Sequence, residues 1–431
     1  MIPEVIRGSR WEVSALFGVT LLVTILFAFL NPVGLTPDEG AHYLRAWEVS
    51  RGHLVNKVAS DGISISCDEY IFAAKRPDGV VNVAYFDQRA ETHLHQPGCT
   101  ASTRNTANLY PAVPYIFSAT GIRLGEFMGF SFKGKLVAAR LLNALASCFI
   151  VFFGLRAMTD LKRVVLFLFI IPGVATQIGS ISADAISYAL IFRLALNWVD
   201  ISQAGIARKS TIASSIVLSL FLGWSKPIQG LFSLVFSSFL FEKRLERTDK
   251  WMLGVAVPMI AILAMIVTRA QVSPYLGNGA APFDQIVYAL SHPITTLGVF
   301  ATSTFTHLHD YVLQVSLGIP FKIISVVWAY AILAAFLTLA ITSTALPRLA
   351  RLFALGTALM LIAAPIASMY LVYNPPGYKE VLGVQGRYFI PALVLIPFAI
   401  SGMLTRVRLS RGLKIALFSI APISSVAMAL L

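Results

Sequence analysis

Two adjacent carboxylates, Asp38 and Glu39, lie just beyond the first apolar segment of this 431-residue chain. At a membrane edge, a carboxylate can accept the proton of an attacking hydroxyl from a lipid-borne or a water-soluble substrate. His42 follows Asp38 by four residues and Tyr43 follows Glu39 by four, so each pair shares one face of a helix. Arg45 lies within the next turn. The spacing predicts a catalytic pair, Asp38 and Glu39, beside the substrate-binding residues His42, Tyr43 and Arg45.

The same residues also have a purely structural interpretation. Thr36 can cap a helix whose first position is Pro37, and Glu39, three residues after Thr36, completes a capping box. Asp38 and Glu39 would then only complement the helix dipole. The sequence leaves both interpretations open.

Three further segments place ionisable groups at the ends of apolar runs. Asp184 lies near one end of a predicted membrane helix, where a charge is costly unless it is paired or faces a polar cavity, although it could also cap that helix. Lys226, in a short hydrophilic break, could meet a phosphate or extend to the interface. Arg387, followed by Tyr388, has the planar guanidinium that suits a lipid phosphate, or it could be an interfacial anchor. We expect Asp184, Lys226, Arg387 and Tyr388 to bind substrate.

No metal site or cofactor is predicted. His307, His309 and Asp310 share one loop, but two histidines spaced by one residue are weak evidence for metal binding, and a divalent metal remains an unsupported alternative. The chain also has no Gly-rich phosphate loop, kinase signature or Ser-His-Asp pattern. Nucleotide-dependent chemistry is therefore not expected.

These candidates belong to a very apolar chain. It is 57% hydrophobic and 13% charged, against roughly 25% charged residues in an average soluble domain. The first apolar segment has the roughly 20 residues needed to cross about 30 Å of hydrocarbon, and it is too long for a signal-peptide core. We predict one all-α polytopic integral membrane domain over residues 1–431, not a β-barrel. About eleven spans are expected, near 11–30, 136–156, 163–179, 182–200, 210–224, 226–241, 252–268, 321–346, 352–373, 388–405 and 413–431.

Two long loops, 31–135 and 269–320, are expected on the outer side, both carrying interfacial helices. Within the first loop, residues 110–130 are apolar but interrupted by prolines and charges, which predicts a helix lying in the membrane interface. Basic residues before the first span and in the short loops indicate a cytoplasmic N-terminus. They account for the net charge of +13 through contacts with membrane lipids, without nucleic acid.

Two of the three cysteines, Cys67 and Cys99, lie in the first long loop. They are a candidate disulfide if this loop faces an oxidising compartment. Closing about 30 residues would then stabilise the loop by roughly 3–4 kcal/mol. Two free thiols remain the alternative.

The run from Asp38 to Tyr43 resembles a motif of GT-C membrane glycosyltransferases. Protein O-mannosyltransferases and lipid A aminoarabinose transferases carry an Asp-Glu pair in the first outer loop, often followed by His or Tyr. The segments Asn108–Tyr115 and Ala138–Leu141 are similar to the sequel in those families, and Asp184 and Arg387-Tyr388 match later motifs. Tyr110-Pro111-Ala112 departs from their His-Pro-Pro.

The chain is more similar still to an uncharacterised bacterial membrane family, known only as a domain of unknown function. Its members show Pro-Pro-Asp-Glu, then Lys-Pro, then Gln-Gly-Arg-Tyr. The corresponding residues here are Thr36–Glu39, Lys226-Pro227 and Gln385–Tyr388, with Thr36-Pro37 replacing Pro-Pro. The likeness runs in order along nearly the whole chain.

The resemblance to the transferases implies a GT-C-like fold with its site beneath the two outer loops. It implies a hexosyltransferase of the bacterial inner membrane that takes a sugar from polyprenyl (undecaprenyl) phosphate and modifies an O-antigen, lipopolysaccharide or other envelope glycan or lipid-linked acceptor. On chemical grounds Asp38 would be the general base, Glu39 and Asp184 would orient hydroxyls, and Arg387, with Lys226 as second choice, would hold the phosphate. Transfer would invert the anomeric centre.

Two other functions remain open. A polysaccharide polymerase or ligase that uses a lipid-linked oligosaccharide would need the same outer loops and basic phosphate site. A flippase or transporter would instead place charges near the membrane midplane. The ionisable candidates here gather at one edge, which disfavours transport.

Overall fold

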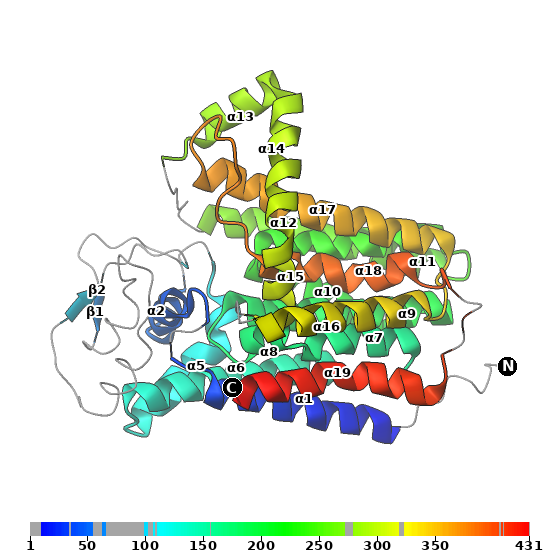
Figure 1. Cartoon of the computed structure of the whole chain (residues 1–431), viewed down its shortest axis with the longest axis horizontal. Coiled ribbons are helices and arrows are strands. Elements are labelled where there is room, and N and C mark those ends of the chain that lie inside the picture. Colours follow the sequence, from blue (N-terminus) through cyan, green and yellow to red (C-terminus); the bar gives the residue numbers. More distant parts are fainter. Residues whose placement is uncertain are drawn as a thin grey trace.

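The computed structural model describes residues 10–33, 36–54, 63–65, 99–101, 107, 110–155, 157–271, 279–318, 323–404, 407 and 409–430. Most of its helices run side by side along one axis and form a bundle (Figure 1). The bundle contains α1 (Arg10–Leu30), α6 (Phe132–Phe152), α7 (Asp160–Ile170), α8 (Pro172–Ile178), α9 (Ala183–Ala204), α10 (Lys209–Ser225), η4 (Pro227–Phe241), α11 (Arg247–Trp251), η5 (Met252–Ala256), α12 (Val257–Gln271), α16 (Ile323–Ile341), α17 (Arg348–Tyr373), α18 (Ile390–Ile400) and α19 (Arg411–Leu430).

The apolar helices make this a polytopic membrane protein, as expected from composition. Six of the described helices are long and apolar enough to cross a membrane, and the number is seven if α7 and α8, bent by 66° at their junction, form one broken span. The bend falls at Pro172, which has no backbone N–H to continue α7. The other expected spans correspond to shorter helices, so the eleven-span count stays a prediction.

Helix α9 is the centre of the bundle, with nearly every residue buried. Its N-cap is Ser182, whose hydroxyl accepts a hydrogen bond from the N–H of Asp184 at 3.0 Å. It ends at Gly205, which adopts the left-handed conformation (φ 68°) favoured at helix C-termini. The buried Trp198 indole donates to the carbonyl of Val235 at 3.1 Å. These contacts fix the helix that carries Asp184.

Helical structure is interrupted at Lys226, between α10 and η4. Lys226 has extended backbone angles (φ −143°, ψ 96°), and Pro227 begins the next element, a 3-10 helix. A proline disfavours helical geometry in the residue before it, which explains the break. The two expected apolar runs are therefore separate elements, with Lys226 at their junction.

Short elements cover one end of the bundle, here called the α2 end. Helix α2 (Glu39–Ser50) is seen nearly end-on in Figure 1, so it crosses the bundle axis. The segment expected at the interface forms η3 (Val113–Tyr115) and α5 (Ile116–Phe127), and the 12 residues of α5 are too few to cross the membrane. The strands β1 (Ile63–Ile65) and β2 (Cys99–Ala101) form an antiparallel pair.

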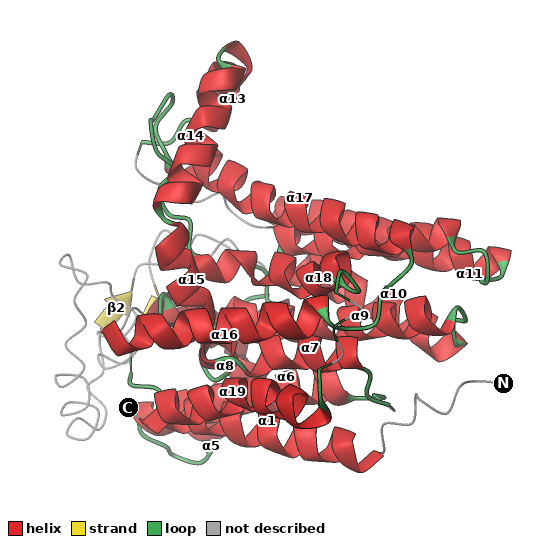
Figure 2. Cartoon of the chain, turned by 45° about the vertical axis from the view of Figure 1, so that its right-hand side comes forward, coloured by secondary structure: helices red, strands yellow, loops and turns green. Residues whose placement is uncertain are grey.

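The described part of the second long loop, residues 279–318, forms three helices. These are α13 (Pro282–Ser291), α14 (Pro293–Thr306) and α15 (Leu308–Leu317). Figure 2 shows α13 and α14 projecting from the bundle beside α17. Three contacts tie them to the loop 374–385: Gln285 Oε1 accepts from the N–H of Gly377 (2.8 Å), Ser303 Oγ accepts from the N–H of Val381 (2.9 Å), and His307 Nε2 pairs with Glu380 Oε1 (2.7 Å).

The His307–Glu380 contact is expected to weaken as pH rises. The hydrogen bond to Glu380 and the nearby Asp310 raise the pKa of His307 above its ordinary value of 6.5. A raised pKa means that the contact stabilises the fold fully below the ordinary value and is lost as pH rises through the folded-state value. Amide hydrogen exchange in the loop 374–385, corrected for intrinsic rate, should therefore increase between about pH 6 and 8. In a His307→Gln variant, exchange in this loop should no longer depend on pH over this range. If the variant showed the same pH dependence as wild type, the His307–Glu380 contact would not be its cause.

Candidate functional site

Four charged side chains meet at the α2 end of the bundle. Arg387, in η6 (Gly386–Phe389), donates from Nη2 to Oδ2 of Asp38 at 2.6 Å. Its Nε lies 3.8 Å from Oδ2 of Asp184, and Oδ1 of the same carboxylate pairs with the ammonium of Lys226. We call Asp38, Arg387, Asp184 and Lys226 the ion cluster. Its charges alternate in sign and sum to zero.

Burial divides the ion cluster into a deep and an outer pair. The side chain of Asp184 is 1% exposed and that of Lys226 11%, whereas that of Asp38 is 19% exposed. Buried charges are costly unless paired, so the deep pair depends on its partners. Among the described residues, no acceptor forms a hydrogen bond with the buried Nε of Arg387. The cluster thus has a buried N–H donor, Nε of Arg387, that faces the Asp184 carboxylate at 3.8 Å without a hydrogen bond.

Tyrosines enclose the two cations. The rings of Tyr110 and Tyr388 each lie 5.3 Å from the ammonium of Lys226, and the guanidinium of Arg387 lies 5.7 Å from the Tyr388 ring. Such cation–π contacts stabilise a positive charge. The Tyr188 hydroxyl donates to the carbonyl of Arg387 at 2.6 Å and so fixes its backbone. The predicted site residues Asp184, Lys226, Arg387 and Tyr388 are therefore brought together.

Gly386 lets this segment approach α15 closely. A Cβ at this position would lie 2.5 Å from the carbonyl oxygen of Tyr311. Its N–H donates to Oε1 of Gln314 at 2.6 Å. Close packing of this segment against α15 therefore requires a glycine at position 386.

His42 lies beside the ion cluster as an uncharged group. Its Nδ1 is 2.6 Å from the Tyr115 hydroxyl, and its ring lies 5.7 Å from that of Tyr110. Burial, and next the positive charge of Arg387, lower the pKa of His42 to about 3. At physiological pH the imidazole can exchange hydrogen bonds but adds no charge.

Asp38 has an unusual backbone conformation. It is the one non-glycine residue with positive φ (64°) in the part of the chain that the structure describes. Aspartate tolerates this left-handed region better than most residues. It is the N-cap of α2 but makes no side-chain cap bond. The helix begins at Glu39, and the Thr36 hydroxyl accepts from Nδ2 of Asn31 at 3.2 Å, so the capping box that the sequence allowed does not form.

Glu39 joins three parts of the framework. Its carboxylate accepts from Nε (2.7 Å) and Nη2 (2.5 Å) of Arg140 on α6, and from the N–H of Ile181 (3.0 Å) before α9. Arg140 also donates to the carbonyl of Asn31 at 2.6 Å. Glu39 is 1% exposed and lies outside the ion cluster. These contacts hold the start of α2, and with it Asp38, against α6 and α9.

Two other predicted residues contact side chains and backbone around α2. The buried Tyr43 packs edge-on against Phe132, with ring centroids 5.4 Å apart. Arg45 is fully buried; it pairs with Glu48 at 2.9 Å and donates to the carbonyl of Tyr110. Their environments are structural, and neither residue is retained in the site.

Several contributors were missed by sequence reasoning. Arg140 had a visible signal, because a lone arginine in an apolar helix requires a partner. Gln229, whose Nε2 lies 3.4 Å from Oδ1 of Asp184, could have been suspected from its place one turn after Lys226. Tyr188 gave no signal, because its role depends on a residue far along the chain.

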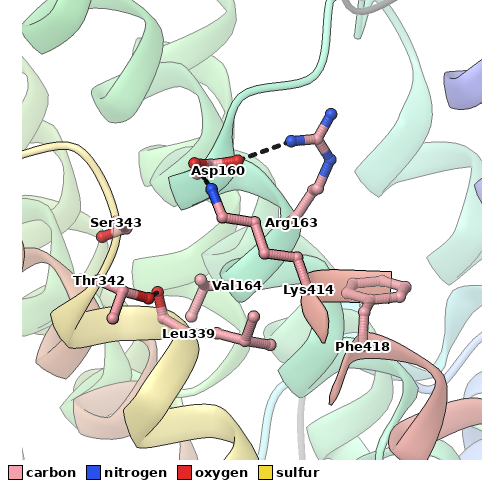
Figure 3. A pocket seen from close by; sticks show the side chains of 8 residues that line it. All are labelled: Asp160, Arg163, Val164, Leu339, Thr342, Ser343, Lys414 and Phe418. Carbon is pink, nitrogen blue, oxygen red and sulfur yellow. Dashed lines mark hydrogen bonds and ion pairs between the residues drawn. The ribbon is translucent and has the colours of Figure 1, made fainter. Parts of the chain in front are cut away.

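Figure 3 shows a small cavity lined by residues at the start of α7, the end of α16 and the start of α19. In Figure 1 these helix ends lie at the end of the bundle opposite to α2. The volume of the cavity is about 30 Å³, room for about one water molecule. Its cations are already paired: Lys414 with Asp160 at 2.6 Å, and Arg163 with Asp160 and Glu12 at 2.7 Å each.

The remaining predictions concern metals and cysteines. Within the described residues, no group of three or more His, Cys, Asp or Glu side chains could hold a metal ion. His309 Nδ1 lies 3.0 Å from the hydroxyl of Tyr330, away from the contacts of His307. Cys67 lies outside the described residues, and for Cys99 only the backbone is described, in β2.

The fold and site together define a class: a polytopic helical membrane protein with a buried ion cluster at one end of its bundle. The chain belongs to the family described as "Predicted membrane protein (DUF2142)", which matches residues 21–396. The match includes all four members of the ion cluster, and it confirms the similarity to an uncharacterised membrane family. Comparisons with curated proteins and with solved structures gave no match.

Proposed function

We propose that this protein is an inverting GT-C-type membrane glycosyltransferase. It moves a sugar from polyprenyl phosphate to a hydroxyl of a glycan or lipid-linked acceptor. The observation that carries the proposal is the ion cluster, in which a partly exposed carboxylate, Asp38, pairs with the buried cation Arg387, and Asp184 links Arg387 to a second buried cation, Lys226. Sugar transfer needs this combination: a base for the acceptor and positive charge for the leaving phosphate.

In this mechanism Asp38 is the general base. The acceptor oxygen attacks the anomeric carbon while its proton passes to the Asp38 carboxylate. The bond between that carbon and the phosphate oxygen breaks, and the phosphate leaves with the electron pair. Attack from the face opposite the phosphate inverts the anomeric centre. The donor already carries its leaving group, so no nucleotide is required.

The cations stabilise the leaving phosphate. The Nε–H of Arg387 has no hydrogen-bond acceptor among the described residues and can donate to a phosphate oxygen. Lys226 adds a second charge from between Tyr110 and Tyr388. Charges held in a partly dry site act more strongly than in water and need no reorganisation during the reaction.

The other residues hold or orient the reacting groups. Asp184 fixes Lys226 and faces Arg387, while the neutral His42 and the tyrosine rings offer hydrogen bonds and a platform to a sugar. Glu39, predicted as a second catalytic acid, is assigned to positioning because Arg140 and Ile181 occupy its carboxylate.

The proposal also includes the finer topology. Eleven spans and a cytoplasmic N-terminus would place the ion cluster on the outer side of a bacterial inner membrane. The described helices of the two outer loops, α2 and α5 in the first and α13, α14 and α15 in the second, would cover it there. The acceptor would be an envelope glycan such as O-antigen.

Transfer assays with purified protein test the proposal. We expect product from polyprenyl-phosphate hexose and none from a lipid-diphosphate oligosaccharide. Arg387→Ala should lower the rate by about 10²–10³-fold, since one preorganised charge on the leaving group is lost. Arg163→Ala, at the opposite end of the bundle, is the matched control and should retain activity. Product from the oligosaccharide donor alone would instead favour a polymerase or ligase.

A further inference from the structure

We propose that the Asp38–Arg387 pair is a latch that the lipid phosphate opens, so that the donor must bind before Asp38 can act as a base. This inference rests on the proposed function and specifies how the same site is regulated. In the structure, Asp38 receives the Nη2–H of Arg387 at 2.6 Å. A carboxylate held in that way cannot also serve an acceptor hydroxyl well, because its negative charge is already engaged.

The two pairs of the ion cluster differ in how easily they can open. Asp184 and Lys226 form the deep pair, further held by Gln229 and the two flanking tyrosine rings. The Asp38 carboxylate is the most exposed member, and separating it from Arg387 returns it towards water. Separating the outer pair therefore costs less free energy than separating the deep one, because water can solvate the Asp38 carboxylate once it has left Arg387.

Arg387 has a reason to exchange partners. Besides Asp38, it donates to the carbonyl of Pro37 at 3.2 Å, and its Nε has no hydrogen bond within the described residues. A phosphate oxygen could satisfy Nε and another could take Nη2 from Asp38, which is the two-point geometry that a guanidinium offers to phosphate. The phosphate then replaces Asp38 as the negative partner of Arg387, while Asp38 itself stays ionised.

The exchange couples the two halves of the reaction. Before donor binding, Asp38 is engaged, so water and acceptor meet a weakened base. After the phosphate takes Arg387, the Asp38 carboxylate is released next to the anomeric carbon. The latch thus predicts an ordered mechanism, in which donor binding precedes productive acceptor binding.

Binding of polyprenyl phosphate to the purified protein in detergent tests the latch without any transfer. Because Asp38 competes for Arg387, Asp38→Asn should bind this lipid up to about tenfold more tightly than wild type, if the open form is about one tenth populated. Asp38→Gly is a second variant that suits the positive φ at this position, and should show the same gain. Asp160→Asn removes a carboxylate of an ion pair at the opposite end of the bundle and should bind as wild type. Unchanged or weaker binding by both Asp38 variants would overturn the latch.

Further arms separate the latch from the proposed function. Inorganic phosphate and phosphatidic acid are the comparison ligands. Because the exchange at Arg387 needs only a phosphate, the same relative gain is expected for each of them that reaches the cluster; a gain confined to inorganic phosphate would overturn a lipid-opened latch. If no sugar donor supports transfer but the Asp38 variants bind polyprenyl phosphate more tightly, the latch stands and glycosyl transfer fails. If wild type transfers sugar and the variants show no gain, glycosyl transfer stands and the latch fails.

Discussion

Replacing Asp38 with asparagine is expected to lower the rate of sugar transfer by about 10²–10⁴-fold, the usual contribution of a positioned general base. The amide keeps the shape of the side chain and tolerates the left-handed backbone, but it cannot accept the acceptor proton. The measurement is initial rate with saturating polyprenyl-phosphate hexose, at matched amounts of folded protein.

The control for this prediction is Asp160→Asn, which removes a carboxylate far from the ion cluster and should leave the rate within about twofold of wild type. Asp38→Glu keeps the charge but displaces it by one methylene, so partial activity is expected. Full activity in Asp38→Asn would rule out Asp38 as the base.

Replacing Glu39 with glutamine is expected to destabilise the protein by about 3–5 kcal/mol, because the buried Arg140 loses its countercharge. The side chains of Arg140 and Glu39 are 1% and 0% exposed, so water cannot replace the lost partner. Thermal unfolding in detergent, followed by intrinsic fluorescence, would show a lower midpoint and a smaller folded fraction.

The double variant Glu39→Gln with Arg140→Met distinguishes charge imbalance from loss of packing. Removing both charges leaves no unpaired ion, so part of the stability should return, although Asn31 loses a donor. Stability within about 1 kcal/mol of wild type for Glu39→Gln alone would contradict the assigned framework role.

The ion cluster could be found largely from sequence. Asp184, Lys226 and Arg387 are isolated charges next to apolar runs, where each must have a partner or a function. Asp38 was found because it follows a span directly. The sequence could not show that these four residues bond with one another, since pairing depends on contacts between distant helices.

On α2 the sequence did not show which side chains lie beside the ion cluster. Helical periodicity puts His42 on the Asp38 face and Tyr43 on the Glu39 face, but it does not say which face meets the site. Packing against α5 and α6 buries Tyr43 beside Phe132, and Arg45 bonds with backbone carbonyls. The local sequence likewise allowed a capping box at Glu39. In the structure, the Glu39 carboxylate instead forms an ion pair with Arg140 on another helix.

The spacing of the ion cluster along the chain bears on how the protein is made. Asp184 and Lys226 are 42 residues apart, so their pair can form while the ribosome is still adding the later helices. Asp38 and Arg387 are 349 residues apart, so their bond waits until residue 387 has entered the membrane. Such a long-range contact forms late. A nascent chain that ends before residue 387 can therefore contain the deep pair of Asp184 and Lys226, but not the outer pair.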